Sequence, residues 1–246
     1  MKHEARDRGR IGVLVPFTNT NLEPDLMMMR PPGTTLHFQR LGGYDVDEIP
    51  ASGQMAGLGA SDITHDLQMI AGVRPDVVLY GCTSATLTHG PAFDADLAQR
   101  IRENSGASCF TAAGALVSAL KVLGIAKAGF SSPYVGEIND QATDFLQSNG
   151  IEIVKRADIG RPLSNYGQGE LTPQEVFELA CKADDRDAEA IILSCTDMRS
   201  AEAVSTIEKA LGKPVVTSNQ ALVFCTLRTL GIPPHDRLPG RLFDHL

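Results

Sequence analysis

Two cysteines, Cys82 and Cys195, are the residues of this chain best suited to carry out chemistry. Each directly follows an apolar, β-branched run, residues 76–80 in one case and residues 188–193 in the other. Such runs are typical of strands that a parallel sheet buries on both faces. A side chain just past the carboxyl end of such a strand lies where open α/β sheets bind their ligands. The recurrence of this arrangement in both halves of 246 residues predicts a duplicated fold with one thiol from each half facing a shared cleft.

A thiolate is a good nucleophile, and a thiol can also carry a proton. Its pKa, ordinarily near 8.5, falls where the backbone N–H groups of a helix N-terminus point at the sulfur, and both cysteine loops are expected to run into helices. Two thiols on opposite sides of one carbon can remove a proton from one face and return it to the other. Alternatively, one thiol adds to a C=C bond while the second supplies the proton. Either reaction requires a site that stabilises an enediolate-like anion, and neither requires a metal or an organic cofactor.

The remaining three cysteines, Cys109, Cys181 and Cys225, fall within predicted strand or helix interiors, where a free cysteine is usually a small buried hydrophobe. Neither Cys82 nor Cys195 has a partner at Cys-x-x-Cys spacing, and no histidine pair has ligand spacing, so no metal site is expected. A redox disulfide between Cys82 and Cys195 stays open as an alternative.

Small polar side chains beside the two cysteines are candidates for holding a substrate carboxylate. Thr83 and Ser84 follow the first cysteine and Thr196 follows the second. Asn19 lies just past the first predicted strand, where its amide could donate to the same anion, although a simple turn asparagine is the alternative. Tyr134 occupies the corresponding loop of the second half, and its hydroxyl could reach that anion unless it is a buried structural tyrosine.

A glycine-rich loop from Gly160 to Gly169 could cover the cleft as a lid. It contains Asn165, which from the residues alone is as easily a surface residue as a ligand. His65, His89 and Arg199 are further candidates, but a solvent-facing position is the simpler expectation for both histidines.

Strand and helix patterns alternate along the chain, which predicts parallel sheets with helices on both faces. Strands are expected at residues 11–15, 36–41, 76–80, 108–110, 127–131, 151–157, 188–193 and 215–216. Helices are expected at residues 62–70, 93–104, 112–123, 137–149, 172–183, 201–211 and 221–230.

The order of elements repeats, and residues 111–116 match residues 217–222 partly in letters. The predicted fold class is therefore α/β: two similar, Rossmann-like parallel-sheet halves related by a pseudo-two-fold axis, with the active site between them. Residues 1–117 with 220–246 are assigned to the first half and residues 118–219 to the second.

Composition narrows the class of protein. A formal charge of −8 argues against nucleic acid as a partner, because phosphate binding requires a basic face. No apolar run is long enough to span a membrane, and residues 1–10 lack the apolar core of a signal peptide, so a cytoplasmic protein without a membrane partner is expected.

Several segments together resemble the aspartate/glutamate racemase superfamily, in particular its branch of maleate cis–trans isomerases and arylmalonate decarboxylases. The resemblance extends from Ile11 to about Phe243, and its most specific parts are Val15-Pro16-x-x-Asn19-Thr20, Gly81-Cys82-Thr83-Ser84, Pro133-Tyr134, Ser194-Cys195-Thr196-Asp197-Met198-Arg199 and Pro214-Val215-Val216-Thr217-Ser218-Asn219.

The resemblance to maleate isomerases implies roles for five residues. Cys82 would add to the double bond of the substrate and Cys195 would handle the proton. Asn19, Tyr134 and Asn165 would hold the carboxylates. The superfamily also implies a small mono- or dicarboxylate as substrate and a homodimer or larger homo-oligomer.

The decarboxylase branch is also similar to this chain, for example at residues 90–93 and 240–244. The resemblance implies that those decarboxylases have only the second cysteine, with glycine at the position of Cys82. Cys82 therefore favours a two-cysteine isomerase, with maleate to fumarate as the leading reaction. Racemisation of an amino or hydroxy acid, arylmalonate-type decarboxylation and a non-catalytic metabolite-binding protein are the alternatives.

Overall fold

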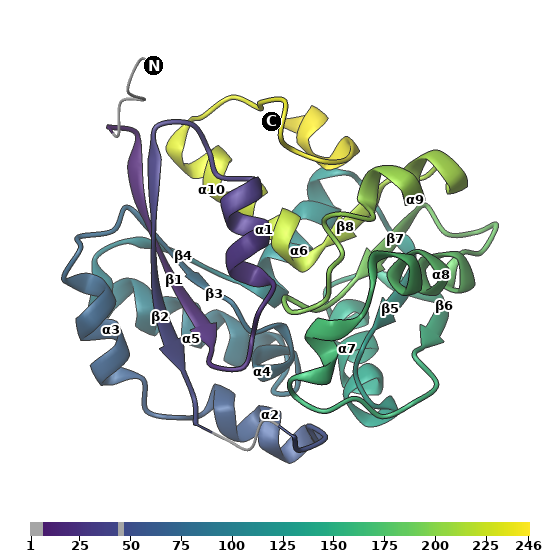
Figure 1. The fold of residues 1–246 in the computed structure, drawn as a ribbon, viewed down its shortest axis with the longest axis horizontal. Coiled ribbons are helices and arrows are strands. Elements are labelled where there is room, and N and C mark those ends of the chain that lie inside the picture. The colour runs from purple at the N-terminus through teal and green to yellow at the C-terminus, as the bar shows by residue number, and fades with distance from the viewer. Residues whose placement is uncertain (1–6, 44–46) are drawn as a thin grey trace.

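Two parallel four-stranded sheets lie side by side in the computed structural model, which describes residues 7–43 and 47–246 (Figure 1). The first sheet has the order β2-β1-β3-β4 and consists of β1 (Gly9–Pro16), β2 (Thr34–Leu41), β3 (Val77–Tyr80) and β4 (Ser108–Thr111). The second has the order β6-β5-β7-β8 and consists of β5 (Lys127–Ser132), β6 (Glu152–Asp158), β7 (Ala190–Leu193) and β8 (Val215–Thr217). In each sheet the four strands are arranged in the order second, first, third, fourth along the chain. This shared order confirms the predicted α/β fold with two similar halves.

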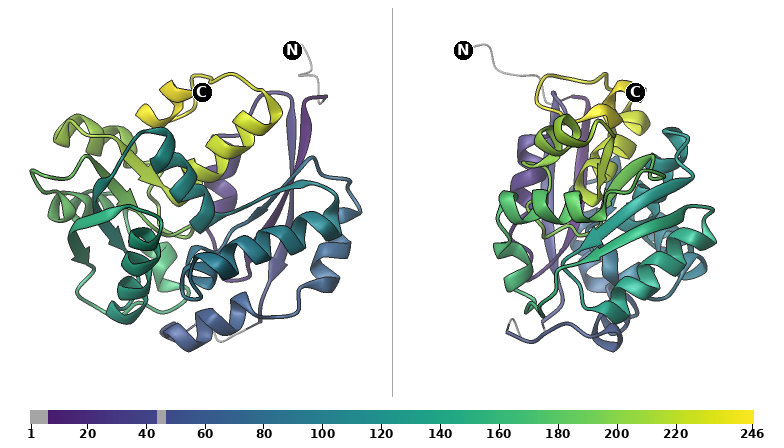
Figure 2. Two further views of the ribbon diagram at one scale, coloured as in Figure 1. Left: turned by 180° about the vertical axis from the view of Figure 1, so that it is seen from behind. Right: turned by 90° about the vertical axis from the view of Figure 1, so that its right-hand side faces the viewer.

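Helices cover both faces of each sheet (Figure 2). The helices up to the end of the first sheet are α1 (Leu22–Met28), α2 (Ser52–Gly59), α3 (Thr64–Ala71), α4 (Thr83–Leu87), α5 (Pro91–Ser105) and α6 (Ala112–Val122). Those that follow are α7 (Gly136–Ser148), α8 (Pro173–Ala183), α9 (Val204–Leu211) and α10 (Ser218–Leu230), with short 3₁₀ turns η1 (Gly167–Glu170) and η2 (Arg241–His245).

The predicted strands all form, whereas two short helices, α1 and α2, were not predicted. Helix α4, which begins at Thr83, confirms that the first cysteine loop runs into a helix. The helix expected at residues 201–211 begins only at Val204, because residues 201–203 form a turn. The second cysteine loop therefore does not lead directly into a helix, and that part of the prediction is wrong.

The internal repeat is visible in the way two helices begin. Thr111 is the N-cap of α6 and accepts a hydrogen bond from the Gly114 N–H, at 3.0 Å. Thr217 caps α10 in the same manner, accepting from Gln220 N–H at 3.1 Å. These are the threonines that align in the sequence repeat, and the two helices pack against each other.

The C-terminal helix α10 also contacts α1, β3 and β4 of the first half (Figure 1). The proposed boundaries, 1–117 with 220–246 against 118–219, stay a prediction. Within the described residues, no helix is both long and apolar enough to span a bilayer.

The strands that carry the cysteines are fully buried. Every residue of β3 and of β7 is buried, as expected of central strands in a doubly covered sheet. Gly81 separates β3 from Cys82, and only glycine fits there: an added Cβ would lie 2.2 Å from a methyl carbon of Leu22 and 3.0 Å from the carbonyl oxygen of Leu14. This close approach brings the first cysteine loop against the loop that follows β1.

Candidate active site

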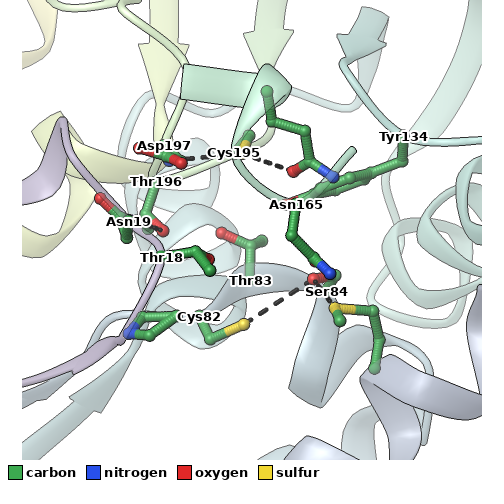
Figure 3. Close-up of a pocket in the computed structure, with 13 residues that line it drawn as sticks. Thr18, Asn19, Cys82, Thr83, Ser84, Tyr134, Asn165, Cys195, Thr196 and Asp197 are labelled. Atoms are coloured by element: carbon green, nitrogen blue, oxygen red, sulfur yellow. Dashed lines mark hydrogen bonds between the residues drawn. The ribbon is translucent and has the colours of Figure 1, made fainter. Parts of the chain in front are cut away.

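The two thiols face one cavity from opposite halves of the molecule (Figure 3). Cys82 follows β3 and Cys195 follows β7, the equivalent strand of the second sheet; the side chains are 6% and 3% exposed. All eight residues that the sequence suggested as a site line this cavity: Asn19, Cys82, Thr83, Ser84, Tyr134, Asn165, Cys195 and Thr196. Their functional roles are taken up below.

The cavity is small, about 30 Å³. On this scale a single water needs about 10–15 Å³, so the space suits about two waters and is too small for a four-carbon diacid. The structure therefore represents a closed state of the site.

Asn19 is oriented by the backbone that follows it. Its Oδ1 accepts hydrogen bonds from the N–H groups of Asn21, at 3.1 Å, and Leu22, at 2.8 Å, at the start of α1. With the oxygen held in this way, Nδ2 faces the cleft and donates to Thr196 Oγ1 at 3.0 Å. The amide is therefore presented as a donor, as the sequence suggested.

Thr196 joins three loops. Its hydroxyl accepts from Asn19 and donates to the carbonyl oxygen of Gly81, at 2.8 Å. A related bond crosses the molecule nearby, since Thr83 Oγ1 donates to Ser218 Oγ at 3.0 Å. Both threonine hydroxyls are thus engaged within the protein, which makes them ties between the halves in the closed state.

The Cys82 thiol lies at the N-cap of α4, 3.7 Å from the hydroxyl of Ser84. Ser84 in turn donates to the sulfur of Met55, at 3.1 Å. Burial raises the pKa of the Cys82 thiol, and the backbone N–H of Ala85 and the Ser84 hydroxyl oppose this rise only in part.

The Cys195 thiol is more strongly disfavoured as a thiolate. Burial and the nearby Asp197 carboxylate raise its pKa to about 12, although the backbone N–H of Asp197, 3.3 Å from the sulfur, and Tyr134 act in the opposite direction. The expectation that helix N-termini depress both thiol pKa values is wrong for this closed state, because desolvation outweighs the hydrogen bonds.

Tyr134 and Asn165 complete the enclosure. Tyr134 is buried beside both thiols, and this burial raises the pKa of its hydroxyl well above the ordinary value. Asn165 reaches the site from the predicted lid loop: its backbone N–H donates to the carbonyl oxygen of Glu48, at 2.8 Å, and its Nδ2 donates to Gln54 at 3.4 Å.

Five lining residues were not among the predicted site residues: Pro16, Thr18, Met55, Gln168 and Asp197. Asp197 stands two positions after Cys195, so proximity in sequence could have indicated it. Gln168 lies on the predicted lid loop, 3.8 Å from the Cys195 sulfur. No sequence pattern marks Met55, since its position depends on how α2 packs on α4.

The other candidates lie elsewhere. His89 is exposed and stacks on Phe93, with ring centroids 3.9 Å apart, and Arg199 pairs with Glu202 at 2.9 Å. His65 is exposed on α3. All five cysteines lie in the described part of the chain, and each is a free thiol. Within the same described residues, no three His, Cys, Asp or Glu side chains gather as metal ligands.

Comparison with known proteins places this site in a family. The family model described as arylmalonate decarboxylase matches residues 11–243. The chain belongs to the arylmalonate decarboxylase family. The curated arylmalonate decarboxylase of Bordetella bronchiseptica is 27% identical over 234 residues, which cover 94% of this chain and 92% of that protein.

Proteins named maleate isomerase are similar to this chain at about the same sequence identity. The maleate isomerase of Geobacillus stearothermophilus is 27% identical over 251 residues, covering 96% of this chain and 97% of that protein. A cysteine-to-serine mutant of the Nocardia farcinica maleate cis–trans isomerase, solved with a covalently bound succinylcysteine intermediate, superposes with a TM-score of 0.86. It is 25% identical and covers 95% of this chain and 97% of its own. The predicted resemblance to this branch is thus confirmed, and the chain is maleate isomerase-like in sequence and fold.

Proposed function

We propose that this protein is a two-cysteine isomerase of a small unsaturated dicarboxylate, with maleate to fumarate as the reaction to test first. The observation that carries this proposal is the pair of thiols that face one cavity from opposite halves. The full-length similarity to maleate isomerases supports it.

Isomerisation follows from the addition and loss of one sulfur. The Cys82 thiolate forms an S–C bond to one alkene carbon, and the π electron pair moves to the neighbouring carbon, where the adjacent carboxylate delocalises it and Cys195 can supply a proton. The former double bond is now single and rotates. Return of the proton to Cys195 lets the electron pair rebuild the double bond as Cys82 leaves, so the trans acid forms with no net change in atoms or electrons.

The surroundings of the two thiols support this division of roles. A backbone N–H favours a thiolate at Cys82, and the Ser84 hydroxyl, 3.7 Å from the sulfur, can do the same once its proton turns away from Met55. Cys195 has the Asp197 carboxylate beside it and a pKa raised to about 12, so it keeps its proton more firmly. A proton donor that stays protonated is the complement that the Cys82 thiolate needs.

Neutral donors would bind the carboxylates. Of the described residues that line the cavity, none is Lys, Arg or His. The amides of Asn19 and Asn165 and the hydroxyls of Tyr134 and Ser84 are the groups available for this role, while Thr83 and Thr196 can contribute once the halves separate. In a site that excludes water, such fixed dipoles are effective at stabilising an enediolate-like anion.

Proton NMR with maleate in deuterated buffer tests the proposal. Fumarate formation by the wild type and none by Cys82→Ala is the expected result. The matched control is Cys109→Ala, which removes a buried thiol outside the cavity. Wild-type protein that leaves maleate unchanged would contradict the maleate assignment, and deuterium uptake at the α-carbon of chiral 2-substituted acids would then examine racemisation.

Decarboxylation of a malonate is the second candidate, because the family match and the Bordetella relative favour it. In this reaction carbon dioxide leaves, and Cys195 alone would protonate the resulting enediolate. The discriminating measurement is carbon dioxide release from an arylmalonate: activity that survives Cys82→Ala but not Cys195→Ala would favour the decarboxylase.

A further inference from the structure

A cluster of hydrogen bonds beside the cavity joins three loops that are far apart in the sequence. These loops are residues 18–22 after β1, η1 and the second cysteine loop. At its centre, Asp197 Oδ1 accepts from the backbone N–H groups of Thr20, at 2.7 Å, and Asn21, at 3.1 Å. The Asp197 side chain is 5% exposed, so these bonds replace water that a buried carboxylate has lost.

Asn21 extends the cluster to the loop that covers the cavity. Its Nδ2 donates to the carbonyl oxygens of Asp197, at 2.7 Å, and Gly169, at 2.9 Å, and lies 3.2 Å from Asp197 Oδ1. Because these neighbours are all acceptors, only the amide nitrogen can occupy this position. One side chain therefore holds both η1 and the second cysteine loop to the first half.

Gly169 is fitted closely into the cluster. An added Cβ would lie 2.7 Å from Thr20 Oγ1, 3.0 Å from Asn21 Nδ2 and 3.0 Å from Asp197 Oδ1. The neighbouring Gln168 is buried against the Cys195 thiol, at 3.8 Å. Any separation of Gly169 from Asn21 therefore also uncovers Cys195.

We propose that Asp197 and Asn21 are positioning residues that fasten η1 over the cavity as a lid and fix the Cys195 loop, and that breaking their contacts opens the site to its substrate. The cavity of about 30 Å³ requires such an opening, because it is too small for a diacid. Asp197 contributes twice, since its backbone N–H also donates to the Cys195 sulfur at 3.3 Å. We call these contacts of Asp197, Asn21 and Gly169 the clasp. The clasp belongs to the same site as the proposed function, but it does not depend on maleate being the substrate.

Hydrogen–deuterium exchange of residues 163–171, read by mass spectrometry, tests the clasp without any substrate. Asp197→Ala and Asn21→Ala each remove hydrogen bonds of the lid, so exchange in this segment should rise about tenfold. Asp197→Asn keeps an oxygen at the Oδ1 position and should stay within about twofold of the wild type. Asn149→Ala is the matched control, since it removes an asparagine-to-carbonyl bond of 2.8 Å at the end of α7.

Gly169→Ala tests the close approach while leaving Asp197 and Asn21 intact, and it should also raise lid exchange about tenfold. Gly57→Ala is its control, because an added Cβ there meets no atom within 4 Å. Unchanged lid exchange in Asn21→Ala and Gly169→Ala would overturn the proposal. If either variant also raises exchange in α6, general destabilisation is the cause. In that case the lid exchange of Asp197→Ala is compared with that of Asp197→Asn, and equal exchange in the two would overturn the proposal.

Alkylation of Cys195 by iodoacetamide gives a second readout. Asn21→Ala keeps the Asp197 side chain, and we expect it to speed the labelling of Cys195 by about tenfold. Gly169→Ala, which keeps both Asp197 and Asn21, should speed it by a similar factor if opening is the cause. Cys109, buried outside the site, should keep its slow labelling. Equal acceleration at both cysteines would contradict a local clasp.

Discussion

Cys82 and Cys195 occupy equivalent positions in the two halves, yet their surroundings differ. Cys82 caps the short helix α4 and has Ser84 within reach, whereas Cys195 has the carboxylate of Asp197 two residues away. The loops that follow the two strands therefore place a hydroxyl beside one thiol and a carboxylate beside the other. This difference is the reason that the proposed reaction assigns the nucleophile to Cys82 and the proton transfer to Cys195.

The pH dependence of turnover reports which thiol must ionise. Because burial raises the pKa of Cys82 above its ordinary value, the thiolate fraction of the free enzyme keeps growing as the pH rises past 8.5. We expect kcat/KM for maleate to rise with pH up to at least about 9, in initial-rate measurements. A plateau beginning near pH 7 would contradict a buried, neutral Cys82 in the resting site.

Replacing Cys195 while keeping Cys82 should stop the reaction at the covalent adduct. With Cys195→Ser, the nucleophile is intact but the hydroxyl is a far poorer proton carrier, so we expect turnover to fall by about 10²-fold or more. Intact-protein mass spectrometry should then show one added molecule of the acid, located on Cys82 by peptide mapping. An adduct on another cysteine would reverse the assigned roles.

Residues at strand ends could be predicted from the sequence because the carboxyl ends of parallel strands converge. Asn19, Tyr134 and the two cysteines were found in this way, and the structure brings them to one cavity. Met55 could not be predicted, because it lies on α2, a short helix that no sequence pattern indicates. The thiol pKa values could not be predicted from the sequence either, because they depend on how completely the loops around the cavity exclude water.

Among the elements, α1 and α10 are joined by a buried polar pair. Asp25 of α1 accepts a hydrogen bond of 2.7 Å from Asn219 of α10, whose Nδ2 also donates to the carbonyl oxygen of Thr196, at 3.1 Å. Burial raises the pKa of Asp25 to about 7, despite the bond from Asn219. The two helices thus support the second cysteine loop from behind.

Asp25 makes stability depend on pH. Its folded-state pKa is above the ordinary 3.8, so between about pH 4 and pH 7 the native state binds more protons than the unfolded chain, and the free energy of unfolding falls as the pH rises. Asp25→Asn keeps an acceptor for Asn219 without the buried charge. We expect it to be more stable than the wild type above pH 7, by roughly 4 kcal/mol at most, with the difference shrinking towards pH 4.

Urea unfolding at pH 5 and pH 8 provides the measurement for Asp25→Asn. The matched control is Asp244→Asn, at an exposed position of η2, which should behave as the wild type at both pH values. A variant that is less stable than the wild type at pH 8 would show that the carboxylate form of Asp25 is needed for the contact between α1 and α10.

Helix α8, which begins just after η1, was predicted from its capping residues. Thr172 accepts from the Glu175 N–H, at 3.2 Å, and Glu175 accepts from the Thr172 N–H, at 2.9 Å. Thr172→Ala should lower the free energy of unfolding by about 1 kcal/mol, as loss of an N-cap usually does. Thr143→Ala, in the interior of α7, is the control, and equal losses in denaturant unfolding would contradict a specific role of the cap.

For the whole molecule, the halves meet through the same side chains that line the cavity. Asn19 bonds to Thr196, Thr196 bonds to Gly81 and Thr83 bonds to Ser218, so the bonds that join the halves also position residues of the cavity. We expect a ligand in the crevice to bond to the same side chains and therefore to residues of both halves. Ligand binding should therefore stabilise both halves together.

This coupling predicts how an unreactive dicarboxylate such as succinate affects thermal unfolding. A ligand that binds only the folded state at about 100 times its Kd contributes roughly 2.7 kcal/mol, which should raise the Tm of a single transition. Cys82→Ala should keep most of the shift, because the thiol acts on the double bond that succinate lacks. Asn19→Ala should lose most of it, since the amide both faces the cavity and bridges to Thr196. Two transitions, of which only one moves with succinate, would show instead that each half binds and unfolds alone.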